Sequence, residues 1–257
     1  MEKLPAATGL LWIKQGFALF RKRPAEVSML FLAYMFLMLA LGIIPLLGQV
    51  LPLMLVPAFS LAFLQACVNI EQGKRITPGL LLTGFRSAAV ANLLKLGVAY
   101  LLAAIVVVGA SSLIDGGVFW SVITGQTLLD AKTVQDSDLA SAMLFSALLY
   151  VPVSMAFWYA APLVAWHQMG VAKALFYSFF AVSGAARPFL VYGLGWGIIG
   201  IVFPAVVSLL AVALLGGSVA VMAILMPLSV ALTIIMYCSF YPTYTAVFGT
   251  AEVPPAA

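Results

Sequence analysis

The stretch FALFRKRPAEVSMLFLAYMFLMLALGII, residues 17–44, joins three consecutive cations to an uncharged apolar run. The run from Val27 to Ile44 contains no Asp, Glu, Lys or Arg, and about 20 apolar residues in a helix cross the roughly 30 Å hydrocarbon core of a bilayer. Lys and Arg gathered directly before such a run are typical of the cytoplasmic end of a membrane-spanning helix. The stretch therefore predicts a membrane protein whose first span begins at Val27, a few residues after the cations.

The same pattern recurs along the whole chain, in which 65% of the residues are apolar and only 8% are charged. A soluble protein has roughly half apolar and about a quarter charged residues. Uncharged intervals separate Glu26 from Glu71, Lys95 from Asp115, Asp138 from Lys173 and Arg187 from Glu252. Each interval is long enough for one or two spans, and we predict six: Val27–Ile44, Val50–Ile70, Leu93–Ile114, Leu139–Trp166, Phe189–Leu214 and Val219–Phe248.

Helices are favoured over a transmembrane barrel, because the runs are apolar on every face and do not alternate with polar residues. The predicted fold class is an all-α polytopic membrane helix bundle, forming one integral membrane domain over residues 1–257. Three hairpin units are expected at 8–70, 78–166 and 171–248, followed by a cytoplasmic tail at 249–257.

The basic residues predict the orientation of the bundle. Eleven of the twelve Lys and Arg residues fall on one side: Lys3, Lys14, Arg21, Lys22, Arg23, Lys74, Arg75, Arg86, Lys95, Lys173 and Arg187. The other side carries two uncharged turns and a loop at 115–138 with four Asp residues and one Lys. Because short cytoplasmic loops are rich in Lys and Arg, both termini are expected in the cytoplasm of a bacterium, with the bundle in its inner membrane. The net charge of +4 averages two unlike surfaces and does not indicate nucleic-acid binding.

Each hairpin unit repeats one order of events: a short amphipathic or aromatic stretch, an outgoing span, a turn, and a returning span that contains a proline. The prolines of the returning spans are Pro57, Pro162 and Pro242. One interpretation is a set of three related hairpins. The other is chance, because Pro, Gly and Phe are common in membrane helices.

The first amphipathic stretch combines a basic side with an aromatic side when it is wound as a helix. Its candidate contacts with anionic lipid of the cytoplasmic leaflet, or with a protein partner, are Trp12, Lys14, Phe17, Phe20, Arg21, Lys22 and Arg23. A helix of this kind can lie in the headgroup plane with its rings at the acyl boundary. Two alternatives stay open: the cations only set the topology, and the aromatic side packs beneath the bundle instead of contacting lipid.

Other motifs favour structural roles. The spacing GWGIIG at 195–200 resembles a dinucleotide fingerprint but lies inside an apolar run and not between a strand and a helix. Gly193, Gly197 and Gly200 are instead expected to let another helix approach closely. His167 is the only histidine, without neighbouring ligands for a metal, and the aspartates of the 115–138 loop lack the glycine and glutamate of a calcium loop. We expect no metal and no cofactor.

The prolines of the returning spans suggest a second functional class, a transporter or channel. Pro57, Pro162 and Pro242 can free backbone carbonyls that line a path for a neutral or amphiphilic solute, although prolines also kink ordinary packed helices. No acid or histidine lies at depth, which argues against proton-coupled transport. An enzyme is the least favoured class, because no pair of acids, exposed thiol or activated serine is apparent.

The stretch WIKQGFALFRKRP at 12–24, the six spans and the short stretches before each outgoing span resemble the uncharacterised conserved integral membrane proteins of proteobacterial inner membranes. More distantly, the layout is similar to the membrane domain fused to some glycerophosphodiester phosphodiesterases. The resemblance covers most of the chain as an arrangement, without catalytic residues. It implies a location, an architecture and a connection with lipids. The function expected is non-enzymatic engagement of anionic lipid or a protein partner, with homo-oligomers among the possible assemblies.

Overall fold

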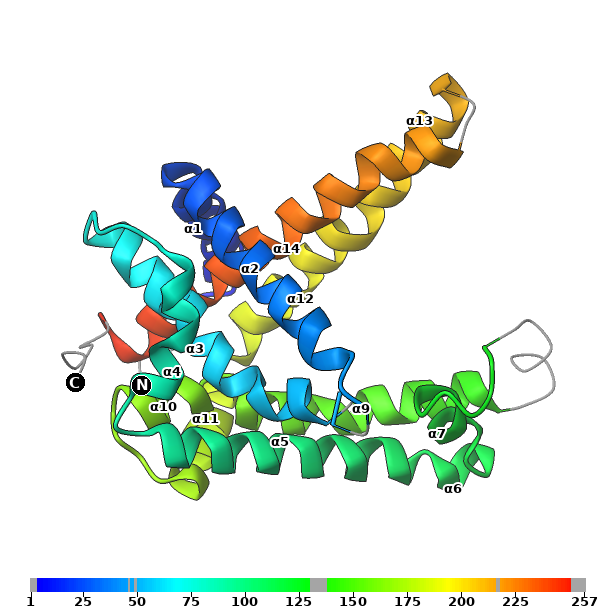
Figure 1. The fold of residues 1–257 in the computed structure, drawn as a ribbon, viewed down its shortest axis with the longest axis horizontal. Helices are drawn as coiled ribbons and strands as arrows, with labels where there is room; N and C mark the ends of the chain where they lie inside the picture. Colours follow the sequence, from blue (N-terminus) through cyan, green and yellow to red (C-terminus); the bar gives the residue numbers. More distant parts are fainter. Residues whose placement is uncertain (1–3, 46, 49, 130–137, 216–217, 251–257) are drawn as a thin grey trace.

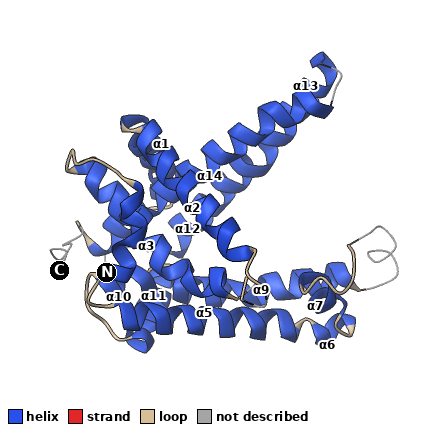
Figure 2. Ribbon diagram, in the orientation of Figure 1, coloured by secondary structure: helices blue, strands red, loops and turns tan. Residues whose placement is uncertain are grey.

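A computed structural model describes residues 4–45, 47–48, 50–129, 138–215 and 218–250. Within these ranges the regular structure is helical and contains no strand (Figure 2). Six helical segments are long and apolar enough to cross a membrane: Pro24–Gly42, Leu51–Glu71, Val90–Asp115, Leu139–Ala165, Ala186–Leu214 and Val221–Phe248. Each coincides with a predicted span to within three residues, so the predicted all-α polytopic fold is confirmed.

The helices follow one another as α1 (Thr8–Lys22), α2 (Pro24–Gly42), α3 (Leu51–Glu71), η1 (Pro78–Leu82), α4 (Thr83–Arg86), α5 (Val90–Ala110), α6 (Ser112–Asp115), α7 (Val118–Ile123), α9 (Leu139–Phe157), α10 (Ala160–Ala165), α11 (Val171–Gly184), α12 (Ala186–Gly197), the π-helical turn η2 (Ile198–Val202), α13 (Phe203–Leu215) and α14 (Ser218–Phe248). Three antiparallel pairs form the hairpins: α2 with α3, α5 with α9, and α13 with α14 (Figure 1). The first span starts at Pro24 because proline suits the first turn of a helix.

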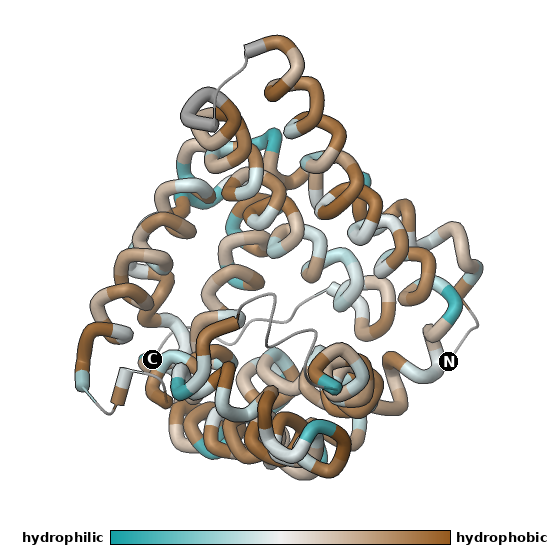
Figure 3. Tube along the Cα trace, turned by 90° about the vertical axis from the view of Figure 1, so that its right-hand side faces the viewer, coloured by the Kyte–Doolittle hydropathy of each residue, from teal (hydrophilic) through white to brown (hydrophobic). Residues whose placement is uncertain are grey.

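The second and third hairpins diverge from one end of the molecule, and the first hairpin runs from that end to the middle of α5, where the Met54 carbonyl meets Gly97 (Figures 1 and 3). We call the shared end the base; it holds the starts of α2, α5 and α12 and the ends of α3, α10 and α14. The returning helices pack closely near the base, where Ala62, Leu163 and Tyr244 are at most 2% exposed. Away from the base, apolar side chains such as Leu209 and Met222 are exposed, as expected for helices that face lipid.

Helix α1 connects the first hairpin to the third. It leads into α2 but packs mainly against α14 and α12. Two glycines on its inner face allow this approach: a Cβ at Gly16 would lie 2.5 Å from the Cβ of Ser239, and one at Gly9 would collide with the carbonyl of Pro188. Small residues at helix contacts bring backbones together in membrane proteins, so α1 is held tightly beneath the third hairpin.

The glycines predicted to pack in the fifth span do not do so within this chain. Apart from the glycine, its chain neighbours and the adjoining backbone of its own helix, no heavy atom of the described residues lies within 4 Å of the position a Cβ would take at Gly193, Gly197 or Gly200. The contact instead occurs at Gly195, where a Cβ would lie 2.5 Å from Cδ1 of Ile13. Gly195 lies two residues beyond Gly193, about 200° around the helix, so the predicted stripe faces away from α1, and its packing against another helix stays a prediction.

The fourth span is broken between α9 and α10, just before Pro162. The hydroxyl of Ser178, on α11, accepts a hydrogen bond from the Tyr159 N–H at 2.9 Å and donates to the Met155 carbonyl at 2.8 Å. A side chain inserted between these two groups replaces the usual bond of residue i to residue i−4, which is an established cause of helix kinks. The break therefore ties α11 to the second hairpin with one fixed face inward.

Candidate functional site

The junction between α1 and α2 is tied to the loop that follows α3. The Arg23 guanidinium donates to the Glu26 carboxylate at 2.8 Å and to the Gly73 carbonyl at 2.9 Å. The Ile76 N–H donates to the other carboxylate oxygen of Glu26 at 2.7 Å. We call this set of bonds the latch, because it joins two segments about fifty positions apart in the sequence.

The latch brings four exposed cations together at the base. Arg21 and Lys22 precede it at the end of α1, and Lys74 and Arg75 lie inside the loop that it closes. The ion pair of Arg23 with Glu26 is the one salt bridge found among the described residues, so none of these four cations forms a salt bridge there. Arg75 is still close enough to the Glu26 carboxylate to interact with it electrostatically. We call Arg21, Lys22, Lys74 and Arg75 the cationic cluster. Its loop half was missed as a site in the sequence, where only the adjacency of Lys74 and Arg75 was visible.

The predicted contact residues on α1 separate into two groups. Lys14, Arg21 and Lys22 are exposed, and Arg23 is used by the latch. The rings point into the protein: Trp12 is 1% exposed, with its ring centroid 5.2 Å from that of Phe189.

The other two rings of α1 are also held by the protein. Phe17 stacks on Trp196 at 6.4 Å between centroids, and half-buried Phe20 packs on the main core. The prediction that Trp12 contacts lipid is therefore wrong, because α1 lies against α12 and α14 on its aromatic side. Of the two alternatives for this side, packing is the one observed.

Helix α11 presents the aromatic surface that α1 does not. Its side chains Phe176, Tyr177 and Phe180 are 61%, 44% and 54% exposed. The Phe176 and Phe180 rings lie 4.6 Å apart, and the Lys173 ammonium lies 5.7 Å from the centre of the Tyr177 ring. Exposed rings next to a cation are typical of a helix at the headgroup–acyl boundary.

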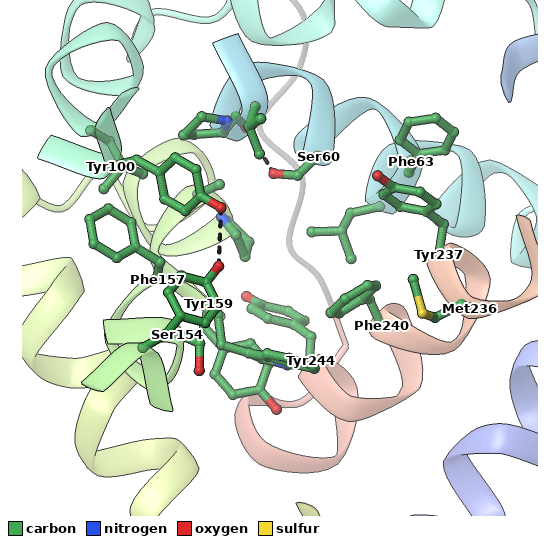
Figure 4. A pocket seen from close by; sticks show the side chains of 18 residues that line it. Ser60, Phe63, Tyr100, Ser154, Phe157, Tyr159, Met236, Tyr237, Phe240 and Tyr244 are labelled. Atoms are coloured by element: carbon green, nitrogen blue, oxygen red, sulfur yellow. Dashed lines mark hydrogen bonds between the residues drawn. The ribbon is translucent and has the colours of Figure 1, made fainter. Parts of the chain in front are cut away.

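A cavity of about 310 Å³ lies between α3, α5, α9, α10 and α14 (Figure 4). It is lined by Val56, Pro57, Ser60, Phe63, Leu64, Leu96, Tyr100, Tyr150, Ser154, Phe157, Trp158, Tyr159, Ala161, Pro162, Met236, Tyr237, Phe240 and Tyr244. Two of the three predicted pathway prolines, Pro57 and Pro162, are among these residues, and Pro242 is not. Aromatic rings dominate the lining, and the sequence could not group them because they come from all three hairpins.

The polar groups of this lining are largely bonded within the protein. The hydroxyls of Ser60 and Ser154 donate to carbonyls three residues back, at 2.9 and 2.7 Å. The Tyr100 and Tyr150 hydroxyls lie 3.1 Å apart, and the Tyr159 hydroxyl donates to the Thr243 carbonyl at 3.0 Å. The cavity therefore offers mainly carbon surface to an occupant.

The remaining polar candidates have structural partners or lie outside the described residues. His167 Nε2 is 2.8 Å from the Tyr244 hydroxyl. Asp115 accepts hydrogen bonds from the N–H groups of Gly117 and Phe119 at the start of α7. Most of the acidic half of the 115–138 loop, including Asp130 and Asp136, lies outside the described residues. In the described ranges no group of three or more His, Cys, Asp or Glu is placed to hold a metal ion.

The six spans, the cationic base and the apolar cavity define a polytopic α-helical membrane protein. No protein-family profile matches the chain, and no solved structure does. The chain is 35% identical over 257 residues to a protein of Burkholderia thailandensis described as a "Probable inner membrane protein", with 97% of this chain and 94% of that protein covered. The chain belongs to this family of inner membrane proteins. The more distant likeness to phosphodiesterase membrane domains stays a prediction.

Proposed function

We propose that this protein is a non-enzymatic component of the inner membrane that engages anionic lipid of the cytoplasmic leaflet through its cationic cluster. The observation that supports this most directly is the latch, which joins the segment of Arg21 and Lys22 to that of Lys74 and Arg75, while none of the four forms a salt bridge among the described residues. A Lys or Arg near an anionic lipid surface contributes about 1 kcal/mol to binding. Four such groups in one place favour lipids with a net negative charge over zwitterionic lipids.

The surrounding helices suit this role. The rings of α1 anchor its inner face on the third hairpin, so the cations at its end extend from a fixed helix and lose little freedom on binding. Phe176 and Phe180 of α11 are also exposed at the base, where α11 follows the second hairpin. Rings at the acyl boundary and cations at the phosphates would place the base at one membrane surface.

Replacing all four cluster residues by glutamine tests the proposal. We expect the variant, purified as the full chain in detergent, to retain much less phosphatidylglycerol in native mass spectrometry than the unaltered protein. Retention of phosphatidylcholine should change little, because it carries no net charge. Unchanged phosphatidylglycerol retention would reject the proposal.

A matched control variant loses the same number of positive charges at positions outside the cationic cluster. It replaces four other exposed cations by glutamine: Arg86, Lys95, Lys173 and Arg187. We expect the control to retain more phosphatidylglycerol than the cluster variant. Equal losses would show that net charge, and not the cluster, binds the lipid.

The proposal also requires the base to face the cytoplasm. Single cysteines at the exposed positions Lys22 and Gln126 test this, since the native Cys67 and Cys238 are buried. An impermeant maleimide should label Lys22→Cys in inside-out vesicles and Gln126→Cys in intact spheroplasts. The reverse pattern would invert the topology and remove the proposed contact with cytoplasmic lipid.

A second candidate function is passage of a neutral or amphiphilic solute between the hairpins. The observation that favours it is the cavity beside Pro57 and Pro162. Uptake of such a solute into vesicles that depends on the cavity, and not on the cationic cluster, would favour this alternative.

A further inference from the structure

We infer that the cavity is a binding site for one hydrocarbon chain of a membrane phospholipid, which enters from the bilayer. This site is separate from the cationic cluster, and nothing in its lining depends on the headgroup charge. The inference rests on the chemistry of the lining, the size of the cavity and the side from which it can be reached.

The lining selects for hydrocarbon. Its serine hydroxyls are bonded to backbone carbonyls, and the Tyr159 hydroxyl is bonded to Thr243. The Trp158 Nε1–H points to the Thr243 hydroxyl, 3.4 Å away. A polar solute would give up its hydrogen bonds to water without gaining these groups as partners. A hydrocarbon chain has no hydrogen bonds to give up.

The volume suits one chain. Pockets for small ligands range from about 300 to 1,000 Å³, and this cavity of about 310 Å³ is at the lower limit. A complete phospholipid with a headgroup and two chains would not fit, so the headgroup and second chain would remain outside.

The cavity is closed toward the base and open away from it. On the base side, Tyr159 and Tyr244 are 2% exposed and Leu163 is fully buried. On the other side Tyr150 lines the cavity and is itself 40% exposed. The residues of α14 that line it lie about 6 to 18 Å from the end of that helix at 1.5 Å per residue. When α14 spans the bilayer with its end at the membrane surface, as the proposed topology requires, these residues face the acyl chains and the opening of the cavity meets lipid.

The fluorescence of Trp158, which lines the cavity, tests the site. The full chain is reconstituted in phosphatidylcholine vesicles whose acyl chains carry bromine, and the contribution of Trp158 is the difference between the unaltered protein and Trp158→Phe. We expect most of that contribution to be quenched. The matched difference for Trp12→Phe should show little quenching, because Trp12 is 1% exposed and does not line the cavity.

Two variants that each place a larger side chain in the cavity, from opposite sides, test whether the brominated chain quenches Trp158 from inside the cavity. Ser60→Phe and Ser154→Phe should each restore Trp158 emission. The control is Ser229→Phe, on the exposed face of α14, where the serine makes the same kind of bond to a carbonyl three residues back as Ser154 does; it should leave the quenching unchanged. If one filling variant fails to fold, as judged by gel filtration, the other still carries the test.

Two results would overturn the inference. Quenching of Trp158 no stronger than that of Trp12 would mean that no hydrocarbon chain occupies the cavity. Apolar cavities in proteins can remain empty. Strong quenching that persists in both filling variants would mean that lipid reaches Trp158 from outside the cavity. Because the vesicles are zwitterionic, neither result depends on the cationic cluster.

Discussion

Helices α1 and α11 have similar lengths, 15 and 14 residues, and both lie at the base, yet they expose opposite kinds of side chain. Helix α1 carries three cations and three aromatic rings, and α11 carries one cation and four rings. On α1 the rings are inside, with Trp12 at 1% exposure, and the cations are outside. On α11 the rings are outside, with Phe176 at 61% exposure.

The small residues of each helix explain the difference. On α1, Gly9 and Gly16 share a face with Trp12. Because the backbone of α1 lies close to α12 and α14 at these glycines, the Trp12 ring is buried between the helices. On α11, Ala174 and Ser178 are fully buried against the second hairpin, and the rings occupy the opposite face. The position of small residues relative to the rings, and not the number of rings, decides which helix offers aromatic side chains to lipid.

The largest expected effect comes from removing one ring from each helix. Trp12→Ala should lower the free energy of unfolding by about 3–5 kcal/mol, as for other large buried aromatics. Phe176→Ala should change it by no more than about 0.5 kcal/mol, as at other surface positions. Denaturant unfolding of both variants in the same detergent measures the contrast, and equal losses would refute the assignment of an inner and an outer aromatic face.

A smaller effect should follow when the bond that orients α11 is removed. Ser178→Ala leaves the Tyr159 N–H and the Met155 carbonyl without their present partner. A buried polar group without a partner costs about 1–3 kcal/mol, and we expect a loss of that size in the same unfolding assay.

Ser183→Ala is the control for this substitution. The Ser183 hydroxyl bonds only to the Phe179 carbonyl of its own helix, and such bonds add little to helix stability. The comparison of α1 with α11 would be weakened if both serines gave the same small change, because the inward face of α11 would then depend on apolar packing alone.

The candidate site was only partly predictable from the sequence. Arg21 and Lys22 were recognised from their adjacency at the first span, which is a local pattern. Their grouping with Lys74 and Arg75 depends on the latch between Arg23 and Gly73, two residues fifty positions apart. The spacing of Gly193, Gly197 and Gly200 predicted one shared side of a helix, but no sequence pattern states which side of a helix that is apolar all round meets a neighbour.

By itself, the sequence determined the class of protein, the number of spans and their limits to within three residues. Those properties follow from the length of each uncharged run, because every stretch that crosses hydrocarbon must satisfy its backbone within its own helix. Only the tertiary structure decided that α1 packs on the third hairpin, that α11 carries the exposed rings and that α5 and the three returning helices enclose a cavity. These features are contacts between distant segments, and in a chain of uniformly apolar helices they depend on where small residues allow two backbones to meet.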